Sequence, residues 1–224
     1  MSKLPRTTLY LLITSSLLVF VIGGNFACKL WTIRPIESKS QKSNVATQAF
    51  NADAYVDSIW ESKLLPVVLE KAIDLPTLLT ALDANAEAAK KQYGLRYDEG
   101  ATHFIVKGEA VIIRANEQSP QRTLTIKPAN YQGKTEIVLQ VGPVFRGTAL
   151  RDAVGFIKFT DFGNQLQYAE VSTKLHERVT DKVIREFHVH DGAKVSFYAA
   201  FTLNDPKKIL LTPVKYEYLG GGRV

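Results

Sequence analysis

The chain has 224 residues, a formal net charge of +6 at pH 7 and 46% hydrophobic residues. Its basic residues are dispersed, whereas nucleic-acid binders carry a basic stripe with interleaved aromatic residues, so we expect no nucleic-acid partner. The single cysteine, Cys28, excludes a disulfide within one chain, and stability must therefore come from packing.

The first 28 residues have the pattern of an export signal. Lys3 and Arg6 precede an uncharged apolar run over residues 7–27, and small residues stand before Cys28. We predict a protein of the bacterial cell envelope that is membrane-anchored and faces the periplasm. Two arrangements stay open. Either Cys28 is lipidated after cleavage, or the run, close to the roughly 20 residues that cross a bilayer, stays uncut as a transmembrane helix.

The remaining chain divides into a polar stalk over residues 29–49 and one domain over residues 50–219. The domain is long enough to enclose one sizeable core. A helix is predicted near residues 53–65, where Pro66 should stop or kink it. A second helix is predicted over residues 76–93, with Asp74 as its cap and Gly94 as a left-handed stop.

From Thr102 onward the hydrophobic period changes to two, which predicts strands. The expected strands cover residues 104–113, 121–126, 136–141, 156–159, 194–203 and 209–219, and a helix over 166–185 precedes the last two. The pattern indicates an α+β fold, in which two packing helices precede a small antiparallel barrel with an inserted helix. Such a barrel is of the oligonucleotide/oligosaccharide-binding (OB) type. The expected core contains Leu79, Leu82, Ile105, Val111, Ile126, Val138, Phe197, Phe201 and Val214.

Two polar segments follow the third strand, Gly-Thr-Ala-Leu-Arg-Asp at residues 147–152 and Asp-Phe-Gly-Asn-Gln at residues 161–165. Their backbone N–H groups, guanidinium, amides and carboxylates form a set that could recognise an anion or a polyol. The candidate ligand-binding residues are Gly147, Thr148, Arg151, Asp152, Asp161, Asn164 and Gln165.

A structural role for the same segments stays open beside the binding role. In that case Arg151 is paired with Asp152 or Asp161 in a structural network, and Asn164 caps the following helix. If residue 151 lies on a strand, Asp152 points the other way, so we expect Asp161 or Glu170 as the partner of Arg151.

Catalytic and metal motifs are weak in this sequence. Ser172, His176 and Asp181 have the residue types of a hydrolase triad but lack an elbow motif around the serine. His188 and His190 provide two metal ligands, whereas catalytic zinc takes three from the protein. We expect no enzyme activity, no metal and no cofactor.

Four segments together carry a family resemblance: residues 55–63, 147–152, 159–169 and 195–204. From about Cys28 to Tyr218 the chain resembles a bacterial family of predicted periplasmic lipoproteins, domain of unknown function family 2291. Members of that family often accompany sugar-uptake ABC transporters.

The resemblance implies a non-enzymatic, membrane-anchored binding or accessory module associated with sugar uptake. The implied partners are the membrane and a sugar ABC transporter or its binding protein. The alternative is a small-ligand carrier or an enzyme that uses a pocket around residues 147–152.

Overall fold

The structure is a computed structural model that describes residues 50–97, 100–185 and 190–221. The chain divides into residues 1–46 and residues 47–224, and the description concerns the second part. The predicted export signal, the stalk and the lipidation site Cys28 lie outside the described residues. Within the described ranges, no helix is long and apolar enough to cross a membrane.

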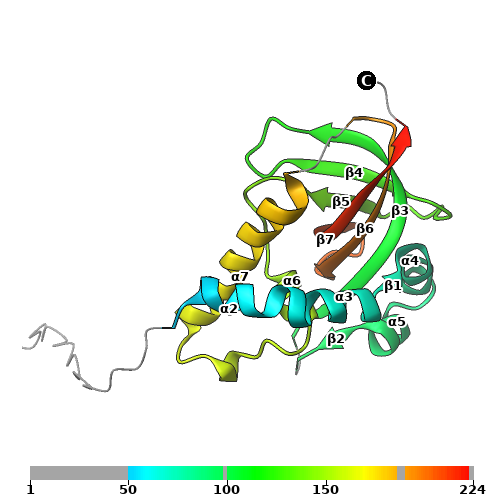
Figure 1. Cartoon of the computed structure of the whole chain (residues 1–224). Helices are drawn as coiled ribbons and strands as arrows, with labels where there is room; N and C mark the ends of the chain where they lie inside the picture. The colour runs from blue at the N-terminus through cyan, green and yellow to red at the C-terminus, as the bar shows by residue number, and fades with distance from the viewer. Residues whose placement is uncertain (1–49, 98–99, 186–189, 222–224) are drawn as a thin grey trace, which may run out of the picture. The chain divides into compact units, whose positions relative to one another are not determined.

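The sheet contains seven strands, and five of them pair in a circuit. The order is β3-β4-β5-β7-β6, and β6 pairs again with β3, so that the sheet curls strongly (Figure 1). The strands are β1 (Ile73–Asp74), β2 (Leu95–Arg96), β3 (Thr102–Asn116), β4 (Thr123–Pro128), β5 (Glu136–Gln140), β6 (Ala193–Thr202) and β7 (Lys208–Gly221).

β1 runs parallel to β3. Within the circuit, the expected antiparallel arrangement holds for every pair except β5 with β7, which run parallel. The reason is the order of the strands. The chain leaves β5 through the inserted helix and returns as β6 beside β3, antiparallel to it. The β6–β7 hairpin then turns back into the place next to β5, and this makes the directions of β5 and β7 equal.

The first helical segment does not stop at Pro66. It runs through α2 (Ala52–Ile59), a π-helical turn (Trp60–Leu64) and α3 (Leu65–Lys71), so of the two predicted outcomes, a stop or a kink, the stop was wrong. A proline cannot donate to the carbonyl four residues before it. The wider turn lets the Leu65 N–H bond to Trp60 O instead, and Pro66 falls in the first turn of α3, where its missing N–H costs little.

The predicted helix over residues 76–93 is two helices, α4 (Leu75–Ala84) and α5 (Ala86–Tyr93). Asp74 caps α4 as expected, accepting from the Thr77 N–H at 3.1 Å. Asn85 is extended and caps α5, accepting from the Ala88 N–H at 3.0 Å. Gly94 is not left-handed (φ −89°). It is needed because a Cβ there would lie 2.1 Å from the Thr102 methyl group.

The region between β5 and β6 is helical. It contains α6 (Ala149–Ala153), a 3₁₀ turn (Phe159–Asp161), α7 (Gln165–Val179) and a π-helical turn (Thr180–Ile184). The helix predicted over residues 166–185 is therefore present. The strand predicted over residues 156–159 was wrong, because Phe159 begins the 3₁₀ turn and no strand of the described chain includes this segment.

Two buried clusters hold these layers together. One is formed by α4 with the inner side of the sheet and contains Leu79, Phe104 and Phe197. The other joins α2, α3, α6 and α7 to the opposite side and includes Leu150 and Leu175.

Most of the expected core residues are buried. The two exceptions are Leu82, which is only partly buried, and Val111, which is 39% exposed. Since Ala110 and Ile112 point inward, the alternation of side chains along β3 leaves Val111 outward.

Candidate functional site

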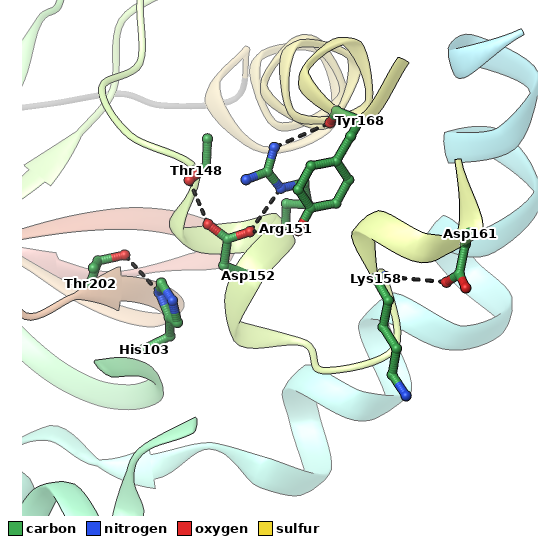
Figure 2. Close-up of polar contacts among 8 residues, drawn as sticks. All are labelled: His103, Thr148, Arg151, Asp152, Lys158, Asp161, Tyr168 and Thr202. Carbon is green, nitrogen blue, oxygen red and sulfur yellow. Dashed lines mark hydrogen bonds and ion pairs between the residues drawn. The ribbon is translucent and has the colours of Figure 1, made fainter. Parts of the chain in front are cut away.

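The segment at residues 147–152 leads into α6 and forms most of it, and its polar groups bond to one another (Figure 2). Arg151 Nε donates to Asp152 Oδ1 at 2.8 Å, and Thr148 Oγ1 donates to Asp152 Oδ2 at 2.5 Å. The expected pairing of Arg151 with Asp161 or Glu170 was wrong. It assumed a strand, and the segment is a short helix in which the neighbouring Asp152 is within reach.

Tyr168 of α7 completes this cluster. Its carbonyl accepts from Arg151 Nη1 at 3.1 Å, its hydroxyl donates to Asp152 Oδ1 at 3.2 Å, and the guanidinium carbon lies 3.7 Å from its ring centroid. Arg151 and Asp152 are each only 9% exposed. Burial, followed by the Asp152 charge, raises the pKa of Tyr168. The buried charges are thus matched inside the protein, as the structural interpretation requires.

The remaining candidate residues do not join this cluster. Gly147 adopts a left-handed conformation (φ +81°) just before α6. Asp161 is exposed and accepts from the Lys158 N–H at 3.2 Å, away from Arg151 in Figure 2. Asn164 caps α7 as predicted, accepting from the Gln167 N–H at 2.9 Å, and Gln165 is an exposed residue in the first turn of α7.

His176 faces the interior from α7, and its ring stacks on that of Phe145 at 4.9 Å. The pKa of His176 is lowered to about 4. The main cause is burial, and the positive charge of Arg151 makes a smaller contribution in the same direction. The Nε2 atom of His176 and the Oγ of Ser172 are buried without a hydrogen-bond partner among the described residues. His176 is therefore neutral in the folded protein at neutral pH.

We expect the stability of the protein to fall in mild acid because of His176. The pKa of His176 is about 4 in the folded protein and has the ordinary value of 6.5 in the unfolded chain. Its contribution to the free energy of unfolding is therefore complete above pH 6.5 and is lost as the pH falls towards 4. Between pH 7 and pH 5 this loss is about 2 kcal/mol. His103, whose pKa is also lowered mainly by burial, acts in the same direction.

Urea unfolding at the two pH values measures this loss. His176→Phe keeps the ring contact with Phe145 and should reduce the difference between pH 7 and pH 5. The same substitution at the exposed His190 is the matched control and should leave the difference as in the wild type. Equal pH dependence in the wild type and His176→Phe would contradict the assignment.

A second site lies beside α4, where a groove of about 1020 Å³ opens over three strands. α4 supplies one wall with Thr77 and Thr80, and the loop after β4 supplies Asn130. Its charged lining residues, together with one tyrosine, are Asp74, Lys107, Glu109, Tyr198, Lys215 and Glu217.

The charges on the strands that border this groove are sorted into two rows. In the strand registers, Lys107 lies opposite Tyr198, and Tyr198 lies opposite Lys215. Two residues further along the strands, Glu109 lies opposite Ser196, and Ser196 lies opposite Glu217. These strands therefore carry a lysine row (Lys107, Tyr198, Lys215) and a glutamate row (Glu109, Ser196, Glu217) on the face opposite to Gly108 and Phe197, against which α4 packs.

The sequence interpretation did not identify these residues. A signal was present, since Lys-x-Glu occurs at residues 107–109 and again at residues 215–217. In a strand this spacing places both charges on one face. Nothing in the chain order indicated that the two motifs share one surface.

The described part of the chain contains no group of three or more His, Cys, Asp or Glu side chains that could hold a metal ion. His188 lies outside the described residues, so the His188–His190 pair is not described as a pair.

Comparison with known proteins agrees with this architecture. The structure is similar to the crystal structure of an OB-fold protein from Thermotoga maritima, with a TM-score of 0.62 and 21% identity over 76% of this chain and 99% of that chain. This likeness supports an OB-like α+β fold and carries no information on activity. No curated protein matches the sequence significantly.

The chain belongs to the family described as predicted periplasmic lipoprotein, domain of unknown function 2291, which matches residues 17–217. This match confirms the family indicated by the sequence segments. The description of the family also agrees with the predicted location, anchored in the cell envelope and facing the periplasm.

Proposed function

We propose that the domain is a non-enzymatic binding module anchored to the cell envelope, and that the groove beside α4 is its binding site. The observation that carries the proposal is the groove itself, about 1020 Å³ in volume, with polar residues of α4 and of the loop after β4 in its walls. Ligand sites are commonly concave regions in which a few polar groups converge.

The alternative site around residues 147–152 has less support. Asp152 accepts three side-chain hydrogen bonds within the protein, from Thr148, Arg151 and Tyr168. Arg151 and Asp152 are also nearly inaccessible to solvent. A ligand at this place would have to break bonds that the folded protein already makes. The small-ligand carrier or enzyme that uses this segment is therefore our second candidate.

A substitution that fills the groove tests the first candidate. Thr80 is exposed on the α4 wall, and Thr80→Trp should block the groove. Lys194→Trp is the control, because Lys194 is exposed and does not line the groove.

The readout is the melting temperature in the presence of a panel of sugars, amino acids and short peptides. A compound present at 100 times its dissociation constant stabilises the folded state by about 2.7 kcal/mol. We expect at least one compound to raise the melting temperature of the wild type and of Lys194→Trp but not of Thr80→Trp. The proposal fails if no compound has this effect, or if the shift survives in Thr80→Trp.

We also propose that the module serves a sugar ABC transporter or its binding protein. The support is the family resemblance, together with a location in the envelope where such transporters operate. A photo-crosslinking residue at Ala84, on the α4 wall of the groove, should capture a transport component in intact cells. The same residue at Lys194 provides the background, and equal capture at both positions would contradict the proposal.

A further inference from the structure

We propose that the domain contacts the membrane surface through an apolar tip formed by the side chains of Phe159 and Leu166. The partner is the lipid bilayer that holds the anchor. This inference goes beyond the proposed function, because the tip shares no residue with the groove beside α4. It follows from the exposure of the two side chains, from the aromatic cluster behind them, and from the place where the chain from the anchor enters the domain.

Both side chains of the tip are exposed in the folded domain. Leu166 is 77% exposed, more than any other large hydrophobic residue of the described chain, and Phe159 is 52% exposed. A single exposed leucine is ordinary at a protein surface. Here two large apolar side chains are exposed within residues 159–166.

The two side chains lie at the same end of α7. Leu166 is in the first turn of this helix, and the ring of Phe159 meets that of Tyr168, near the same end, at 5.6 Å. The side chains of a helix lean towards its N-terminus. A flat surface that approaches the N-terminal end of α7 therefore meets both residues of the tip.

The backbone that carries the tip is held by local hydrogen bonds. The Phe162 N–H donates to Phe159 O at 3.1 Å, and the Gly163 N–H donates to Gln167 Oε1 at 2.9 Å. Asn164 caps α7 directly after this turn. The exposed apolar side chains are therefore presented by an ordered segment.

An aromatic cluster lies behind the tip and keeps Phe159 on its outer side. The ring of Phe162 lies 5.5 Å from that of Tyr168 and 5.3 Å from that of Phe50. Phe162 and Tyr168 are partly buried, whereas Phe159 is exposed. Tyrosine is enriched at the level of the lipid headgroups, and Phe and Leu enter the boundary between headgroups and acyl chains. The cluster consists of Phe50, Tyr55, Phe159, Phe162 and Tyr168.

The chain from the anchor enters the domain at this cluster. Phe50 is the described residue nearest in sequence to the predicted anchor, and its ring packs on Phe162. In Figure 1 the start of α2 lies beside the lower end of α7. Residues 29–49 span at most about 75 Å even when fully extended. A tethered surface has a high effective concentration towards its partner, so a small apolar contact is sufficient.

The charges around the tip indicate an apolar contact rather than an electrostatic one. Residues 158–166 contain one basic residue, Lys158, and one acidic residue, Asp161, and both are exposed. Because the segment has no net charge, anionic lipids should not be needed for the contact.

Fluorescence quenching in vesicles tests the contact. Phe159→Trp and Leu166→Trp are each introduced into the full chain, which is reconstituted into phosphatidylcholine vesicles with or without bromine on the acyl chains. Bromine quenches tryptophan in contact with the acyl region, and the wild-type signal from Trp31 and Trp60 is subtracted. Ile113→Trp is the matched control, because Ile113 is also 52% exposed but lies on β3, outside the cluster.

We expect brominated lipid to quench both tip variants at least about twofold more strongly than Ile113→Trp, because the tip reaches the boundary between headgroups and acyl chains. Adding Leu166→Asp to Phe159→Trp should remove most of this quenching, because a charged side chain is costly at that depth. Adding Ile113→Asp instead should leave it unchanged. Including phosphatidylglycerol in the vesicles should also leave it unchanged.

The inference is overturned if the tip variants are quenched no more than Ile113→Trp, if their quenching requires phosphatidylglycerol, or if it survives Leu166→Asp. None of these results bears on the groove, whose test uses Thr80→Trp and soluble compounds.

Discussion

Replacing Arg151 by alanine should lower the free energy of unfolding by about 3–5 kcal/mol, because it leaves a buried carboxylate without its cation. Asp152 is 9% exposed and would keep only the hydroxyl groups of Thr148 and Tyr168 as donors. The packing of the guanidinium on the Tyr168 ring is lost as well. Chemical denaturation at neutral pH measures the effect.

Two control variants separate the possible causes of this loss. Arg151→Lys keeps the charge but not the planar fork of donors, so its cost should be intermediate. Asp161→Asn lies in an exposed turn and should cost far less. If Arg151→Ala unfolds like the wild type but no longer responds to a compound that stabilises the wild type, the second candidate function is favoured and the structural role is contradicted.

Leu79→Ala should cost about 2–5 kcal/mol, because it removes a side chain from the packed interface between α4 and the sheet. Leu79 is 1% exposed, and it belongs to the same buried cluster as Phe104 and Phe197. The surrounding strands are tied to one another on both sides and leave the site little freedom to collapse around the cavity.

Leu82→Ala is the matched comparison, on the same helix and with the same atoms removed. Leu82 is only partly buried against the cluster, so its loss should be clearly smaller. Thermal and urea unfolding of both variants checks the order. Equal losses, or a larger loss for Leu82, would mean that α4 presents a different face to the sheet.

Local signals predicted many of the elements correctly. Asp74 and Asn164 were identified as caps because a short polar side chain just before a helical apolar pattern can accept a hydrogen bond from the first turn of the helix. The strands β3, β4, β6 and β7 were identified from their period of two. The failures also have local causes. Asn85 divides a continuous apolar stripe into two helices, and Phe159 begins a 3₁₀ turn although its segment has strand-like composition.

The partner of Arg151 could not be predicted, because the prediction depended on the conformation of six residues. On a strand, Arg151 and Asp152 would point to opposite faces. In the short helix α6 they meet, and α7 places Tyr168 over the guanidinium. The residue types were sufficient to predict that Arg151 pairs with a carboxylate. Which carboxylate it pairs with depended on the fold.

The sequence by itself determined the predicted address in the cell envelope, the caps, the period of the strands and the two Lys-x-Glu motifs. These depend on residues close together in the chain, where spacing alone decides which side chains share a face. Only the tertiary structure decided that β3 and β7 lie on either side of β6 in the same direction. That arrangement converts two motifs more than 100 residues apart into a lysine row and a glutamate row on one face of the sheet. Strand order and register arise from packing over the whole domain, and no local pattern contains them.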